Sequence, residues 1–77
     1  MGWCSGTNIF DPVVKTILHE QVDDLVKIKI IKSLVQSLQD SDWDCESDSD
    51  YWKHPLVRTA FKQACPKWDW KDIEQDE

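Results

Sequence analysis

Residues 40–53 contain the side chains of this chain that are best suited to chemistry. They read DSDWDCESDSDYWK, so a carboxylate recurs at nearly every second position and aromatic residues stand between them. Regularly spaced carboxylates can bind a hard cation such as Ca²⁺, or they can present a row of negative charge to a basic surface. The candidate partner-binding carboxylates are Asp40, Asp42, Asp44, Glu46, Asp48 and Asp50, and the candidate aromatic anchors are Trp43 and Trp52.

A calcium-binding loop is a poor match to this run. Asp40, Asp42 and Asp44 alternate like the first three ligands of such a loop. The sixth position, however, is Cys45 rather than glycine, and the twelfth is Tyr51 rather than a glutamate that binds through both oxygens. The two positions that make the motif specific are therefore not met.

A zinc site is the second possibility, with Cys4, Cys45, His54 and Cys65 as the available ligands. Structural zinc sites usually contain close Cys or His pairs that place two ligands on one turn, and no such pair occurs here. We therefore expect no metal or other cofactor, and this four-residue set is an alternative. Three cysteines at long separations instead predict reduced and at least partly buried thiols. No nucleophile and base stand in a specific arrangement, so we expect no enzymatic activity.

The excess negative charge lies in the second half of the chain. The formal net charge is -6; residues 40–77 contain eleven acidic and five basic residues, whereas residues 1–39 contain four of each. A surface of this sign attracts basic protein surfaces and repels phosphate backbones. We expect a protein partner with a basic surface and no direct contact with nucleic acid. Spaced carboxylates can also imitate the charge of a phosphate backbone and occupy a nucleic-acid channel.

Three helices are expected to position the acidic run. A chain of 77 residues that is 40% apolar predicts one small domain. The helical periodicity of apolar residues predicts helices over about 8–20, 23–39 and 55–65, with an acidic loop over 40–53 and an acidic tail over 66–77. The predicted fold class is all-α, a compact three-helix domain on which aromatic-rich N- and C-terminal segments pack.

Individual side chains also have predicted places on these helices. Thr7 or Asn8 should cap the first helix, and Arg58 should point from the third helix to solvent. Val26 and Ile30 flank the polar side of the second helix, so we expect the Trp-rich tail to cover them; the alternative is an apolar edge used for self-association. The predicted apolar face of the first helix consists of Ile9, Phe10, Val13, Val14, Ile17 and Leu18.

Signals for membranes or export do not occur in the sequence. No apolar run approaches the roughly 20 residues that span a bilayer. The N-terminus has no basic region followed by a hydrophobic segment, so we expect a cytosolic protein. The opening MGWCSG is interpreted as a structural clasp in which Trp3 packs on the core.

Two blocks of the sequence, MGWCSGTNIFD and DWDCESDSDYWKHPLVRTAF, resemble a family of small, functionally uncharacterised proteins found in bacteriophages and some bacteria. The resemblance covers most of the chain. It implies a phage or prophage origin and a compact protein of the host cytosol, and it assigns no activity to any residue. Small acidic phage proteins often bind and inhibit a host enzyme or defence complex.

The resulting hypothesis is a non-enzymatic protein that binds and modulates or inhibits a host or phage protein through its acidic half. Two other classes of protein stay open as alternatives. One is a zinc-stabilised structural module that uses the four-residue set above. The other is a homo-oligomeric structural protein that associates through Val26 and Ile30.

Overall fold

The computed structural model describes residues 4–75, and every regular element in this range is helical. The elements in chain order are η1 (Cys4–Gly6), α1 (Thr7–His19), α2 (Asp24–Asp40), η2 (Glu46–Asp48), α3 (Pro55–Ala64) and α4 (Trp70–Gln75), where η marks a 3₁₀ helix. The all-α class is confirmed, and the predicted helices match α1, α2 and α3 to within a residue at each end. The short helix α4 was not predicted, and the clasp expected of Trp3 lies outside the described residues. Within residues 4–75, no helix combines the length and apolarity needed to cross a membrane.

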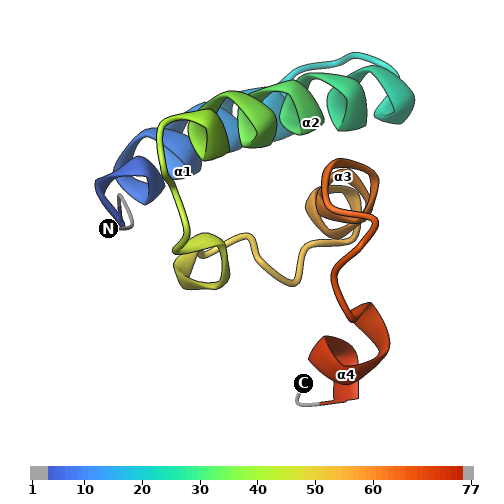
Figure 1. Ribbon diagram of the computed structural model, residues 1–77. Helices are drawn as coiled ribbons and strands as arrows, with labels where there is room; N and C mark the ends of the chain where they lie inside the picture. Colours follow the sequence, from blue (N-terminus) through green and yellow to red (C-terminus); the bar gives the residue numbers. More distant parts are fainter. Residues whose placement is uncertain (1–3, 76–77) are drawn as a thin grey trace.

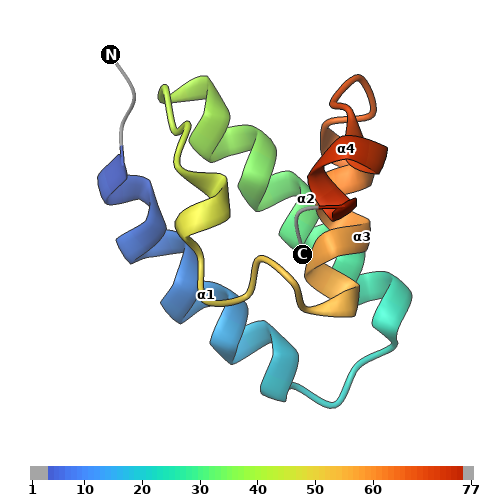
Figure 2. The same ribbon diagram turned by 90° about the horizontal axis from the view of Figure 1, so that it is seen from below.

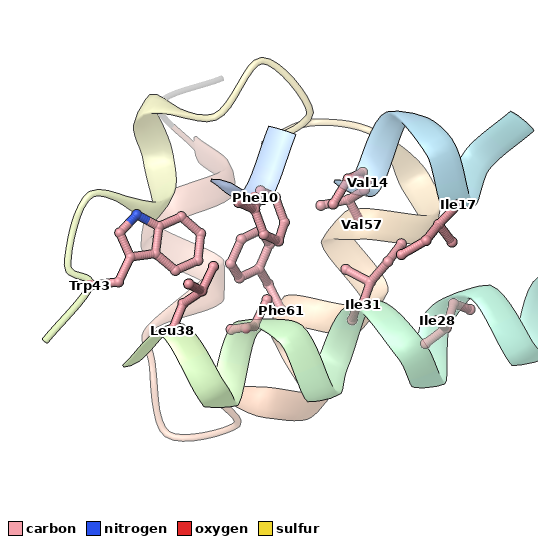
Figure 3. Packing of buried hydrophobic residues seen from close by; sticks show 11 residues of the cluster. Phe10, Val14, Ile17, Ile28, Ile31, Leu38, Trp43, Val57 and Phe61 are labelled. Carbon is pink, nitrogen blue, oxygen red and sulfur yellow. The ribbon is translucent and has the colours of Figure 1, made fainter. Parts of the chain in front are cut away.

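The core lies where the three longer helices meet. α1 and α2 lie side by side and antiparallel, and α3, seen nearly end-on in Figure 1, crosses beneath them. α4 lies beyond α3, away from the α1–α2 hairpin. The fully or nearly fully buried helical side chains are Phe10, Val14 and Ile17 of α1, Ile28, Ile31, Val35 and Leu38 of α2, and Val57, Ala60 and Phe61 of α3 (Figure 3).

Local signals fix the start of two of these helices. The side chain of Asp23 accepts the backbone N–H of the second residue after it at 3.0 Å and so caps α2. The ring of His54 caps α3 in the same way at 3.2 Å, and Pro55 occupies the first helical position, where its missing N–H costs nothing. The prediction that Thr7 caps α1 is wrong. The cap position is Gly6, which has no capping side chain, and the Thr7 hydroxyl bonds to the acidic loop instead.

The end of α2 determines how the chain enters the acidic loop. The backbone N–H of Trp43 donates to the carbonyl of Leu38, and that of Asp42 donates to the carbonyl of Gln39, both at 3.0 Å. This pair of bonds is a Schellman motif, in which the residue after the cap adopts a left-handed conformation. That residue is Asp42, with a φ of 69°, where glycine is more usual. The motif reverses the chain, so that Trp43 points into the core.

Trp43 joins the acidic loop to the helices. Its side chain is 2% exposed, and its ring centroid lies 4.9 Å from that of Phe10 and 6.2 Å from that of Phe61 (Figure 3). Its indole N–H donates a hydrogen bond of 3.0 Å to the Thr7 hydroxyl. The same hydroxyl donates to the backbone carbonyl of Cys45 at 3.3 Å. One buried residue of the loop therefore contacts the start of α1 and the middle of α3.

The apolar faces of α1 and α2 are covered less completely than predicted. Val26 and Ile30 are 44% and 45% exposed, so the expectation that the Trp-rich tail covers them is wrong. The tail packs on α3 instead (Figure 2), where Arg58 binds it. Ile9 and Val13 are also 44% and 39% exposed, which leaves a narrower buried face on α1 than the six residues predicted.

Gly6 allows the indole of Trp43 to approach the backbone. A Cβ atom at this position would lie 2.7 Å from Cδ1 and 2.9 Å from Cγ of Trp43, well inside van der Waals contact. We predict that Gly6→Ala lowers the free energy of unfolding by about 1 to 3 kcal/mol, because the ring or the start of α1 must move. Urea denaturation measures the change. Ser5→Ala, at an exposed neighbour in the same turn, is the control and should change stability by less than about 0.5 kcal/mol. A Gly6→Ala protein as stable as the wild type would contradict this close approach.

Candidate functional site

The acidic loop has a three-residue period of burial rather than the two-residue alternation of a strand. Trp43, Glu46 and Ser49 are buried at 2%, 5% and 6% exposure. The 3₁₀ turn η2 explains this period, because side chains three residues apart overlie one another in such a turn. The acidic row is the set of exposed carboxylates that remains, namely Asp40, Asp42, Asp44, Asp48 and Asp50.

Two of the predicted partner-binding residues are therefore not in the acidic row. The Glu46 carboxylate is turned inward and accepts a hydrogen bond of 2.7 Å from the side-chain amide of Gln39 on α2. Trp43 is part of the core and offers no surface to a partner. Trp52 is half-buried and contributes to a surface pocket, so it keeps the position expected of an aromatic anchor.

Asp11 of α1 holds the far end of the loop. Its carboxylate accepts a hydrogen bond of 2.6 Å from the Ser49 hydroxyl and one of 3.1 Å from the backbone N–H of Asp50. The Ser49 hydroxyl in turn accepts the backbone N–H of Tyr51 at 3.1 Å. Sequence reasoning missed this role, because a single acid on a helix gives no signal of a partner 38 residues away.

Arg58 attaches the C-terminal tail to α3 and is only 9% exposed, so the prediction that it points to solvent is wrong. Its guanidinium carbon lies 4.7 Å from the ring centroid of Trp52 and 5.4 Å from that of Trp70. Its Nε donates to the carbonyl of Trp52 at 3.3 Å, and a terminal nitrogen lies 3.9 Å from the Glu74 carboxylate. A planar guanidinium can make all of these contacts at once, and indole faces attract its charge.

A pocket of about 590 Å³ opens between the acidic loop and the tail. Trp52 and Trp68, whose ring centroids are 6.5 Å apart, supply its aromatic part, and Asp44 supplies an exposed carboxylate. The residues that line it are Asp44, Glu46, Ser47, Trp52, Lys53, Trp68 and Ile73. The indole faces and the carboxylate of Asp44 attract a cationic side chain, whereas the ammonium group of Lys53 at the same pocket opposes this attraction. A second pocket of about 510 Å³ shares Glu46 and Trp68 with the first and so adjoins it.

The cysteines differ from the prediction of three reduced and partly buried thiols. Cys4 and Cys45 form a disulfide with their Cα atoms 5.1 Å apart, and Cys4 is exposed. The two residues are 41 positions apart, and the bonds of Thr7 to the Trp43 indole and to the Cys45 carbonyl lie beside the disulfide that joins them. Cys65 is a free thiol and is buried, as expected. Burial raises the pKa of the Cys65 thiol, against the opposing effect of a hydrogen bond from a neighbouring amide, so the thiol carries its proton at neutral pH.

The predicted zinc set is not assembled. The His54 ring nitrogen Nδ1 is used to cap α3, and Cys65 Sγ accepts the side-chain N–H of Gln39 at 3.1 Å. Among the described residues, the potential metal-ligand group consists of Cys4, Cys45 and Asp48. His54 and Cys65 do not belong to it. Cys4 and Cys45 of the four-residue set therefore lie together, whereas His54 and Cys65 are engaged elsewhere.

Comparisons of the chain with protein-family models, with curated proteins and with solved structures gave no match. Two features of the described residues could take part in binding: the acidic row with its adjoining pocket, and the group formed by Cys4, Cys45 and Asp48.

The contact of Arg58 with the two indoles should determine whether the tail stays on α3. We predict that Arg58→Lys lowers the free energy of unfolding by about 1 to 2 kcal/mol, because an ammonium keeps the charge but loses the planar stacking. Trypsin should also cleave faster at Lys67 and Lys71, which lie in the tail. Urea denaturation and timed proteolysis measure the two effects.

Lys62→Gln is the control for this prediction. Lys62 forms an ion pair with the same Glu74 from an exposed position, so its loss should cost less than about 1 kcal/mol. Equal proteolysis rates for Arg58→Lys and Lys62→Gln would show that the stacked guanidinium does not hold the tail.

Proposed function

We propose that this chain is a non-enzymatic binding protein whose acidic row and adjoining pocket engage a basic surface on a protein partner. One observation carries the proposal. Five exposed carboxylates lie between the end of α2 and residue 50, and one of them, Asp44, lines the pocket that contains Trp52 and Trp68. Charge and an aromatic surface are thus available to a partner at one place.

The two parts of this face have different physical roles. The acidic row gives the field that attracts a basic partner, and exposed charges of this kind act mainly on the rate and specificity of association. The pocket supplies a contact that can exclude water, which is where most binding energy arises. A lysine or arginine of the partner fits it best, because its stem can pack on indole while its charge meets Asp44.

The acidic loop is already fixed in the free protein. Trp43 anchors its beginning in the core, Asp11 holds its end, and the disulfide ties Cys45 to the start of the chain. A loop ordered in advance loses little conformational entropy when a partner binds. The loop is held in place although its carboxylates repel one another, and this supports a role in recognition.

The identity of the partner is inferred from the resemblance described above. A phage origin makes a host or phage protein in the host cytosol the expected partner, and inhibition or modulation the expected effect. A partner that normally binds nucleic acid is favoured, since its basic channel would accept a row of carboxylates in place of phosphates. Direct binding of nucleic acid by this chain is not proposed, because both surfaces are negative.

A charge-matched pair of variants tests the proposal. The row variant carries Asp42→Asn, Asp44→Asn and Asp50→Asn, and the control carries Glu20→Gln, Asp23→Asn and Asp24→Asn in exposed positions of the neutral half. Asp48 is left unchanged, because it lies with Cys4 and Cys45 in the potential metal-ligand group. Both variants lose three negative charges. Capture of a protein from bacterial lysate at moderate salt, followed by an affinity measurement with that purified protein, gives the readout.

We predict that the row variant loses at least about tenfold in affinity, or roughly 1.4 kcal/mol, and that the control binds like the wild type. The row variant should also be at least as stable as the wild type. Its substitutions remove like charges, and Asp42→Asn keeps the left-handed backbone conformation at that position. Equal loss in both variants would mean that only net charge matters, and no loss in either would exclude the acidic row as the binding site.

Self-association is the alternative that a specific observation favours. Val26 and Ile30 lie one turn apart on α2 and are exposed, and the half of the chain that carries them has no excess charge to keep two copies apart. A dimer in sedimentation that becomes a monomer in Val26→Lys would favour this second role over the acidic face.

A further inference from the structure

The disulfide lies among carboxylates. The Asp44 oxygen Oδ1 is 3.4 Å from Cys45 Sγ and 3.9 Å from Cys4 Sγ. The two sulfur atoms and a carboxylate oxygen of Asp48 all lie within 4.8 Å of one another. In the disulfide neither sulfur carries a proton, so Asp44 makes only a contact with them. Once the sulfurs are reduced, both thiols can donate hydrogen bonds to it.

Reduction changes what this group can bind. A dithiol that cleaves the S–S bond supplies two electrons and two protons, becomes a disulfide itself, and leaves Cys4 and Cys45 as thiols. Two thiolates beside two carboxylates would repel one another in the absence of a cation. A divalent metal ion removes this repulsion by taking the place of the two thiol protons.

We propose that the reduced form of this chain binds one Zn²⁺ through Cys4 Sγ, Cys45 Sγ and a carboxylate oxygen of Asp48. Zinc accepts thiolate and carboxylate ligands at about 2.3 and 2.0 to 2.2 Å, which places tetrahedral ligand atoms roughly 3.3 to 3.8 Å apart. After reduction the two sulfurs must move apart from their bonded separation to roughly 3.8 Å, and both already lie within 4.8 Å of an Asp48 oxygen. Cys4 can make this movement, because it is exposed and lies on the single-turn helix η1. The fourth position falls to a water molecule or to Asp44.

The donor atoms select the type of metal. Two thiolates favour Zn²⁺ and similar soft or borderline ions over Ca²⁺ and Mg²⁺, which prefer oxygen ligands only. The zinc ion and the disulfide cannot exist together, since both use the same two sulfurs. Each of them closes the same junction between η1 and the acidic loop, so the junction is held in the oxidised and in the reduced protein.

The test uses the full chain, reduced with a phosphine under nitrogen and titrated with Co²⁺ as a spectroscopic probe for the zinc site. We expect one Co²⁺ per chain with a sulfur-to-metal charge-transfer band in the near ultraviolet, and displacement of Co²⁺ by Zn²⁺. The melting temperature of the reduced protein should rise with Zn²⁺. The oxidised protein should show neither the band nor the rise.

Three variants separate the site from other thiol binding. The double variant Cys4→Ser, Cys45→Ser should lose the charge-transfer band, and Asp48→Asn should weaken Zn²⁺ binding by at least about tenfold. Cys65→Ser, which removes the buried thiol, should bind like the wild type. The proposal is overturned if the reduced wild type shows no band, if Cys65→Ser loses it, or if Asp48→Asn binds Zn²⁺ as tightly as the wild type. None of these outcomes depends on a protein partner, so this site can fail while the proposed binding function holds.

Discussion

The indole of Trp43 packs against the backbone of Gly6, donates a hydrogen bond to Thr7 and contacts Phe61, and this set of contacts positions most of the other features. It attaches a loop after α2 to the start of α1 and to α3. It also helps to bring together the two cysteines of the disulfide, which are 41 residues apart in the sequence. In a domain this small, one buried aromatic side chain is a large share of the apolar surface that stabilises the fold.

The acidic row lowers the stability of the fold locally, and contacts with the surrounding structure offset this effect. Like charges repel along residues 40–50, and Asp42 also adopts a left-handed backbone conformation that suits glycine better. The core contact of Trp43, the hydrogen bonds to Asp11 and the disulfide hold the loop despite this. Sites that break a local rule while their surroundings hold them in place are often functional, which is consistent with a role in recognition for this loop.

The helices could be predicted because apolar periodicity is a local property, and Pro55 and Asp23 mark two helix starts directly in the sequence. The candidate site depends on contacts between distant residues, so less of it could be predicted. The five exposed aspartates were identified, but the inward turn of Glu46 follows from the 3₁₀ turn η2, which alternation does not indicate. Arg58 is buried between the indoles of Trp52, which precedes it in the sequence, and Trp70, which follows it. Only the tertiary fold brings these three side chains together.

We propose that a basic side chain of the partner binds between Trp52 and Trp68, beside the acidic row. Titration of ¹⁵N-labelled protein with a short arginine-rich peptide tests it most directly, with the indole N–H signals as reporters. We expect saturable shifts at Trp52 and Trp68 and none at Trp43, whose indole N–H is bonded to Thr7. The shifts should weaken in the row variant. Equal shifts at all three indoles, or shifts confined to the loop backbone, would contradict the claim.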